Sequence, residues 1–132
     1  MHPFRAAVEK GDLAAVEAML ADDVVFRSPV VFKPYPGKAI TAAILRGVTR
    51  VFDDFRYVRE IGDADGRDHV LVFEARVGER QITGCDFLHF DEDGLIDDFM
   101  VMVRPLSAAQ ALAAAMGEQF DRIAEEAAQA AK

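Results

Sequence analysis

The first quarter of the chain combines apolar positions at helical spacing with one short apolar run. Pro3 suits the first position of a helix, and Asp12 can cap a second helix that runs to Leu20. Residues 24–28 are rich in β-branched and aromatic types, so they predict a strand, which Pro29 closes. The chain therefore begins with two helices and a strand.

A loop and a longer helix follow. Residues 30–37 contain two prolines and a glycine, which predict a loop. From Lys38 to about Phe52 the apolar residues fall on one helical face, which predicts an amphipathic helix. That face consists of Ile40, Ile44, Leu45, Val48 and Val51.

The middle of the chain changes to a two-residue period, which is typical of strands. Alternating apolar positions predict four strands, each joined to the next by a turn that contains glycine. Strands joined by such short turns pair antiparallel. They span residues 55–61, 69–77, 80–90 and 95–103.

The composition shifts after Pro105 to a segment rich in alanine and glutamate. Ser107 is placed to cap a helix over residues 108–132, with Gln110 as the partner in a capping box. One face of this helix is apolar, so it must pack either on its own domain or on a second chain. Its apolar positions are Leu112, Met116, Phe120, Ile123 and Ala127.

Together these elements predict an α+β domain. Helices grouped against a hairpin-built sheet form such a domain, and we expect a cone-shaped, curved antiparallel sheet packed on the N-terminal helices. Residues 1–106 form this domain in the prediction, and residues 107–132 are an added C-terminal helical extension.

Length and charge narrow the function classes. The chain has 132 residues, of which 52% are hydrophobic, and this suffices for one core. A formal charge of −8 argues against binding to nucleic acid or to an anionic membrane. With the single cysteine Cys85 and no signal peptide or membrane-spanning run, we expect a cytoplasmic protein without disulfides.

Asp86 is the candidate for chemistry. By strand parity it lies on the same face as Ile82, Gly84 and Leu88, which are apolar or small. A carboxyl in an apolar pocket has a raised pKa and can donate a hydrogen bond or a proton to a ligand carbonyl. The alternative is a structural carboxylate paired with an arginine such as Arg80 or Arg104, and the sequence leaves both possibilities open.

Other polar residues are weaker candidates. His89 shares the face opposite Asp86, where a lone histidine is usually a surface or interface residue. His69 is a secondary pocket candidate, because it shares a strand face with Leu71 and Phe73. No histidine or cysteine pattern has the spacing of a metal site, so we expect no metal and no cofactor. The acidic residues lack the spacing of a calcium loop and indicate a solvated turn. They are Asp91, Glu92, Asp93, Asp97 and Asp98.

Three segments, taken in order, resemble the nuclear transport factor 2-like superfamily, which includes the SnoaL-like proteins and ketosteroid isomerase. They are the passage from Gly11-Asp12 to Asp22-Asp23, the Ser28-Pro29 pair with the helix after Gly37, and the hairpin 86–96. The resemblance covers roughly residues 3–105 and implies the cone-shaped α+β fold together with an apolar pocket.

The isomerase resemblance also implies roles for particular residues. Asp86 matches the protonated aspartic acid of the isomerase oxyanion hole. Ser28 stands where the carboxylate base would be, and Phe4 stands near the place of the oxyanion-hole tyrosine. Because serine without an activating neighbour is a poor base, steroid isomerisation by that mechanism is not expected.

By the same analogy, one face of the last strands lines the pocket and the other pairs two subunits. Exposed Met100 and Met102, together with His89, suggest a homodimer through the outer sheet face. The pocket would be lined by Phe4, Phe26, Ser28, Tyr35, Ile44, Phe73, Leu88, Phe99, Val101 and Val103.

The sequence therefore predicts a SnoaL-like protein that binds a small hydrophobic or carbonyl-bearing molecule. If it is an enzyme, we expect isomerase, cyclase or dehydratase chemistry assisted by Asp86 as an acid. The alternative is a non-catalytic module for ligand binding or dimerisation.

Overall fold

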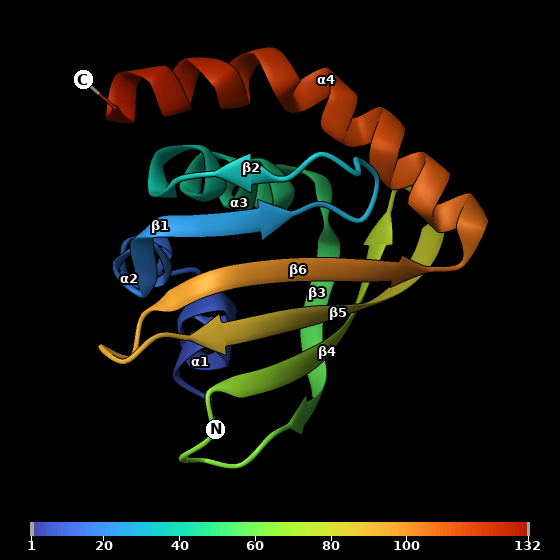
Figure 1. Ribbon diagram of the computed structural model, residues 1–132. Helices are drawn as coiled ribbons and strands as arrows, with labels where there is room; N and C mark the ends of the chain where they lie inside the picture. Colours follow the sequence, from blue (N-terminus) through green and yellow to red (C-terminus); the bar gives the residue numbers. More distant parts are fainter. Residues whose placement is uncertain (1, 132) are drawn as a thin grey trace.

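The computed structural model describes residues 2–131 and confirms the α+β class (Figure 1). Six strands form one curved sheet in the order β2-β1-β6-β5-β4-β3. Along the chain the elements are α1 (Pro3–Glu9), α2 (Leu13–Ala18), β1 (Leu20–Arg27), β2 (Tyr35–Pro36), α3 (Lys38–Val51), β3 (Asp53–Ile61), β4 (Asp68–Val77), β5 (Arg80–Phe90), β6 (Ile96–Arg104) and α4 (Leu106–Ala130).

One strand pair departs from the antiparallel sheet that the sequence predicts. Strand β1 pairs with β6 in parallel, with Leu20 opposite Ile96 and Phe26 opposite Phe99. A local turn signal in the sequence marks only strands that form a hairpin, whereas β1 and β6 lie far apart along the chain. The antiparallel strands β3, β4, β5 and β6 follow one another across the sheet, and the last of them, β6, lies beside β1 and runs in the same direction.

The helix ends show one correct and one incorrect capping prediction. The side chain of Asp12 accepts a hydrogen bond from the Ala15 amide at 3.1 Å, so it caps α2 as expected. The prediction for Ser107 was wrong, because α4 begins at Leu106 after Pro105 and has no side-chain cap bond. Proline has no amide hydrogen and a fixed φ, so it can precede a helix without such a cap. The predicted helix end at Lys132 lies outside the described residues.

The core lies on the concave face of the sheet. Inward residues alternate along β4 and β5, as the two-residue period predicts. Figure 1 shows β3 running across the direction of β6, so the sheet curves around the helices. The largest fully buried side chains are Phe4, Phe73, Phe99, Leu20, Leu71, Ile82, Leu88, Ile96, Val24 and Thr41.

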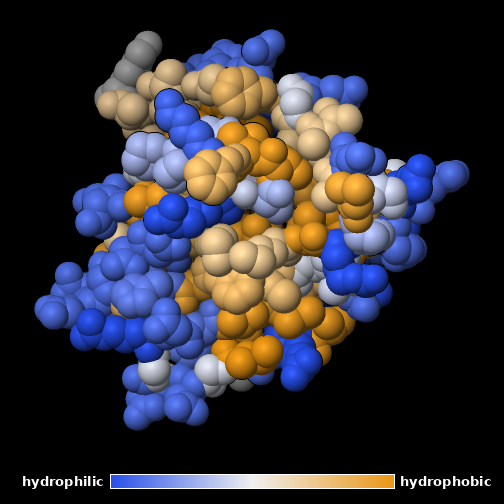
Figure 2. Space-filling model, turned by 45° about the vertical axis from the view of Figure 1, so that its right-hand side comes forward, coloured by the Kyte–Doolittle hydropathy of each residue, from blue (hydrophilic) through white to orange (hydrophobic). Residues whose placement is uncertain are grey.

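The outer face of the sheet carries exposed apolar side chains. Met102 is 52% exposed, and Val58 and Ile61 are also exposed. Figure 2 shows the side on which β6 runs into α4, where hydrophobic residues gather across the middle and lower part between hydrophilic margins. Pairing of two copies through this face stays a prediction. None of the helices within residues 2–131 is long and apolar enough to cross a bilayer.

Candidate functional site

The concave face of the sheet encloses a cavity of about 740 Å³ with helices α1, α3 and α4. This volume falls within the range of roughly 300–1,000 Å³ that small-molecule sites occupy. Asp86 lies on the cavity wall, and eight of the ten residues expected to line a pocket lie there too. Those eight are Phe4, Phe26, Ser28, Tyr35, Ile44, Phe73, Phe99 and Val101.

Two of the expected lining residues lie elsewhere. Leu88 is only 2% exposed and packs in the core, where it pairs with His69 and Phe99 across neighbouring strands. Val103 packs at the edge of the core opposite Gly84, where the ring of Phe73 fills the space in front of the sheet. Strand parity predicts the face of both residues, but it cannot show where along that face the cavity ends.

The polar centre of the cavity is a carboxyl paired with a phenol. The hydroxyl of Tyr57 on β3 donates a hydrogen bond to Oδ2 of Asp86 on β5 at 2.6 Å. Asp86 is 6% exposed and Tyr57 is 4% exposed, so water has little access to either group. Arg80 and Arg104, the candidate partners of a structural carboxylate, are both exposed. The partner of Asp86 is therefore neutral.

Burial without a cationic partner changes the acidity of both groups. It raises the pKa of Asp86 to about 7, although the hydrogen bond from Tyr57 acts in the opposite direction. Burial also raises the pKa of Tyr57 well above its ordinary value, and the neighbouring carboxylate adds to this shift. Near neutral pH, Asp86 can thus hold or release a proton, whereas Tyr57 stays a hydrogen-bond donor.

Sequence reasoning did not single out Tyr57. It predicted only that residues 55–61 form a strand, and the phenol reaches Asp86 because β3 and β5 flank β4 in the curved sheet. The alternation of Phe55 and Tyr57 in this strand was the available signal for an inward tyrosine. That alternation shows which face Tyr57 lies on, but not that its hydroxyl reaches Asp86 on β5, two strands away.

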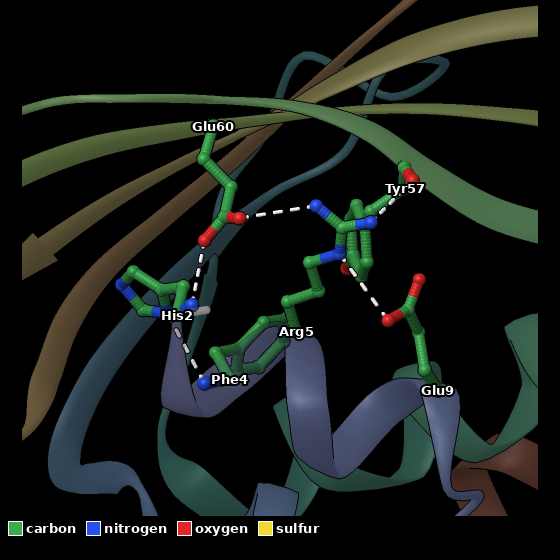
Figure 3. Close-up of polar contacts among 6 residues, drawn as sticks. All are labelled: His2, Phe4, Arg5, Glu9, Tyr57 and Glu60. Atoms are coloured by element: carbon green, nitrogen blue, oxygen red, sulfur yellow. Dashed lines mark hydrogen bonds and ion pairs between the residues drawn. The ribbon is translucent and has the colours of Figure 1, made fainter.

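Arg5 connects helix α1 to the strand that carries Tyr57 (Figure 3). Its guanidinium donates to the main-chain oxygen of Tyr57 at 3.0 Å and to Glu60 Oε2 at 3.0 Å. Its Nε lies 3.2 Å from Oε1 of Glu9, a residue of the cavity rim. The backbone amide of His2 donates to the other oxygen of Glu60 at 2.6 Å. Arg5 therefore fixes the backbone beside the phenol and pairs two carboxylates near the cavity.

We expect Arg5→Gln to lower the melting temperature more than Arg56→Gln does. Both arginines bind a main-chain oxygen and a carboxylate around β3, but only Arg5 joins this strand to α1. The loss of Arg5 leaves two acidic side chains close together without their common cation. Thermal unfolding of both variants checks this, and equal losses would mean that the link to α1 adds nothing.

The other candidates take structural positions. The hydroxyl of Ser28 accepts a hydrogen bond from the Val30 amide at 3.1 Å, which shapes the loop after β1. His69 contacts the Gly66 carbonyl oxygen at 2.9 Å, away from the cavity. His89 lies 2.6 Å from Asp97 on the outer face, and this hydrogen bond raises the pKa of His89. Among residues 2–131, no three histidine, cysteine or acidic side chains are grouped to hold a metal ion.

Comparison with known proteins identifies the family. The sequence model of the SnoaL-like domain family matches residues 2–99. The chain belongs to this family. The prediction of a nuclear transport factor 2-like, SnoaL-like protein is therefore confirmed. No protein with a curated description matches the chain.

Solved structures agree with this SnoaL-like assignment. A steroid delta-isomerase from Pseudomonas aeruginosa is 47% identical, with a TM-score of 0.83 over 89% of this chain and 85% of that one. An uncharacterised bacterial protein with a cystatin-like fold from Silicibacter pomeroyi DSS-3 is 38% identical, with a TM-score of 0.83 over 96% and 95%. A protein of unknown function from Cytophaga hutchinsonii, described as NTF2-like, is 17% identical with a TM-score of 0.58 over 78% and 85%, and it shows the fold alone.

The SnoaL-like cavity also has walls that the sequence did not predict as lining. Phe52 and Phe55, at the junction of α3 and β3, stack near the ring of Phe73, with Phe55 and Phe73 centroids 4.9 Å apart. The C-terminal helix supplies a further wall. Its lining residues are Leu112, Ala113, Met116, Gly117, Phe120 and Ile123. The apolar stripe of α4 thus faces its own chain, which the sequence had left open.

Proposed function

We propose that the cavity binds a small, uncharged, largely apolar molecule through a carbonyl group, with Asp86 as the hydrogen-bond or proton donor. The observation that carries this proposal is the buried Asp86–Tyr57 pair on the wall of an otherwise mostly apolar cavity. Beside this pair a charged group would lose its hydration without gaining an opposite charge, whereas a carbonyl oxygen would gain a donor. The charged residues of the lining, Glu9 and Lys10, belong to the C-terminal end of α1.

The protonation state of Asp86 decides what it does. Below about pH 7 the protonated carboxyl donates to a carbonyl oxygen and stabilises negative charge that develops on it. Tyr57 keeps its own bond to the carboxyl and orients it toward the cavity. This supports acid-assisted chemistry of the isomerase, cyclase or dehydratase type.

The Pseudomonas aeruginosa relative is described as a steroid delta-isomerase, and at 47% identity this favours an apolar ligand for the present chain as well. Moving a double bond also requires a base for a carbon-bound proton. Ser28 stands at the expected position of the base, and its hydroxyl is engaged with Val30. The carboxylate of Glu9 on the rim is paired with Arg5.

That missing base favours a second candidate function, which is binding without turnover. The two functions separate in one assay. An enzyme converts a carbonyl compound and loses this conversion in Asp86→Asn, whereas a binding module is stabilised by the compound and forms no product.

The ketone preference of the cavity tests the proposed donor. We expect butyrophenone to stabilise the protein more than butylbenzene at pH 6, with about fivefold tighter binding, since one hydrogen bond contributes about 1 kcal/mol. At pH 9 this preference disappears, because the ionised Asp86 has no proton to donate. Ligand-dependent thermal shifts at both pH values measure it.

Two variants serve as controls for this experiment. Asp86→Asn keeps an amide donor, so its ketone preference should persist at both pH values. Asp86→Leu removes the donor, so its preference should be absent at both. A wild-type protein that binds both compounds equally at pH 6 would contradict the proposal.

A further inference from the structure

Helix α4 forms one side of the cavity, although the match to the SnoaL-like family ends at residue 99, before this helix begins. Figure 1 shows α4 turning back over α3 and β2 after it leaves β6. The six lining residues recur at helical spacing from Leu112 to Ile123, so a single face of α4 closes the cavity. The acid, by contrast, is carried by β5 in the sheet.

Ion pairs and close packing fix α4 on α3. Glu126 accepts a hydrogen bond from Arg46 at 2.7 Å and lies 3.1 Å from Arg50. Arg50 also donates to Gln119 at 2.7 Å. Ile123 packs against Gly47 so closely that a Cβ at this glycine would lie 2.7 Å from Cδ1 of Ile123. The position of the α4 wall is therefore set by contacts to α3 at several points.

The same face of α4 has a gap along one edge. Ala113 and Gly117, one turn apart, are small and exposed, and both line the cavity. A Cβ added at Gly117 would meet no atom within 4 Å. Met116 and the half-exposed Phe120 border this gap on one side with large apolar side chains. A glycine within a helix costs stability relative to alanine, and here its effect is to leave space beside the ligand cavity.

We propose that α4 is the wall that selects ligand size, with the gap at Ala113 and Gly117 receiving the apolar end of a ligand whose carbonyl end contacts Asp86. Gly117, Met116 and Phe120 are the specificity-determining residues in this arrangement. The ligand class that fits is an apolar molecule with one carbonyl at one end and a hydrocarbon portion long enough to reach α4. This inference rests on the proposed function for the carbonyl end only.

Two homologous series of probes test the wall, namely alkyl phenyl ketones from acetophenone to dodecanophenone and the n-alkylbenzenes of the same chain lengths. In Gly117→Leu, the longest ketones that bind the parent chain should lose about fourfold in affinity for each methylene that the new side chain excludes, whereas acetophenone should bind unchanged. The length limit is the longest alkyl chain that a variant binds without loss of affinity. Met116→Ala should raise this limit, whereas Gly117→Leu should lower it. Affinities from titration calorimetry or ligand-dependent thermal shifts measure both.

Ala114→Leu is the matched control, because Ala114 is exposed on α4 and is not among the lining residues. Its length limit should equal that of the parent chain. An unchanged limit in Gly117→Leu, or the same shift in Ala114→Leu, overturns the inference.

The two series also separate this inference from the proposed function. The length limit could move equally for ketones and alkylbenzenes while ketones show no preference that depends on pH. That result would support size selection by α4 and would contradict Asp86 as the carbonyl donor. If ketones are still preferred at pH 6 while the length limit is unchanged in Gly117→Leu, Asp86 is supported as the carbonyl donor and size selection by α4 is contradicted.

Discussion

Replacing Asp86 with asparagine should raise the free energy of unfolding at pH 8 by up to about 4 kcal/mol, since each pKa unit corresponds to about 1.4 kcal/mol. Burial raises the pKa of this carboxyl from 3.8 to about 7. Above that pH the native protein must hold a charge among apolar side chains, which the unfolded chain keeps in water. Asparagine removes this charge and can still accept the hydrogen bond from Tyr57.

The sign of the pH dependence follows from the same shift. Between about pH 4 and pH 7 the native state holds a proton on Asp86 that the unfolded state has lost. The contribution of this proton to stability is complete below the unfolded pKa and falls as the pH rises toward the folded pKa. The wild type should therefore lose stability relative to Asp86→Asn over this interval, and both should have similar stability near pH 4.

Urea unfolding of both proteins at pH 4, 6 and 8 measures the difference. Other titrating groups contribute to both proteins and cancel in the comparison. Asp98→Asn, a change at an exposed carboxylate whose ion pair with Arg27 lies on the surface, should show no comparable gain. A constant difference between wild type and Asp86→Asn at all three pH values would show that Asp86 titrates normally. A gain would mean that the chain keeps a destabilising acid for the sake of its site.

Gly84→Ala should destabilise the protein by about 3 kcal/mol, as overpacking in a tight core does. The Cβ of an alanine at this position would overlap Cζ of Phe73 and would lie 2.9 Å from the main-chain oxygen of Met102. The Phe73 ring is 1% exposed and stacks on Phe55, so a shift of the ring away from β5 would disturb that stacking. Denaturant unfolding of the variant and wild type measures the loss.

A second variant separates the clash from a loss of strand propensity. Phe73→Leu alone should cost stability, but Gly84→Ala combined with Phe73→Leu should be more stable than the sum of the two losses predicts. Additive losses would place the cost in the backbone of β5 and not in the contact with the ring. The wall of the cavity formed by Phe73 thus depends on a glycine in the neighbouring strand.

Local patterns in the sequence predicted most elements correctly. The apolar stripe from Lys38 and the alternation in the hairpin strands identified α3 and β3 to β6 within two residues at each end. These predictions succeeded because each pattern follows from the geometry of a single element. The parallel pairing of β1 with β6 has no such local pattern, since it depends on how the sheet closes.

The site shows the same limit. Strand parity placed Asp86 on the concave face but left its partner open, because an arginine or a pocket would suit the same position. The partner is Tyr57, two strands away in the sheet. The stripe on α4 likewise predicted a buried face without saying what it covers. Both answers depend on tertiary contacts between segments distant in the sequence.

The two ends of the sheet also bear on how this protein avoids uncontrolled self-assembly. An unpaired edge strand has free backbone hydrogen-bonding groups that can pair with a strand of another molecule. Natural sheets protect such edges with short strands or charged side chains. One edge here is β2, which has only two residues, and the other is β3, where Arg5 already binds the Tyr57 carbonyl oxygen. Arg5, which fixes the backbone at Tyr57, therefore also occupies a hydrogen-bond acceptor with which a strand of another molecule could pair.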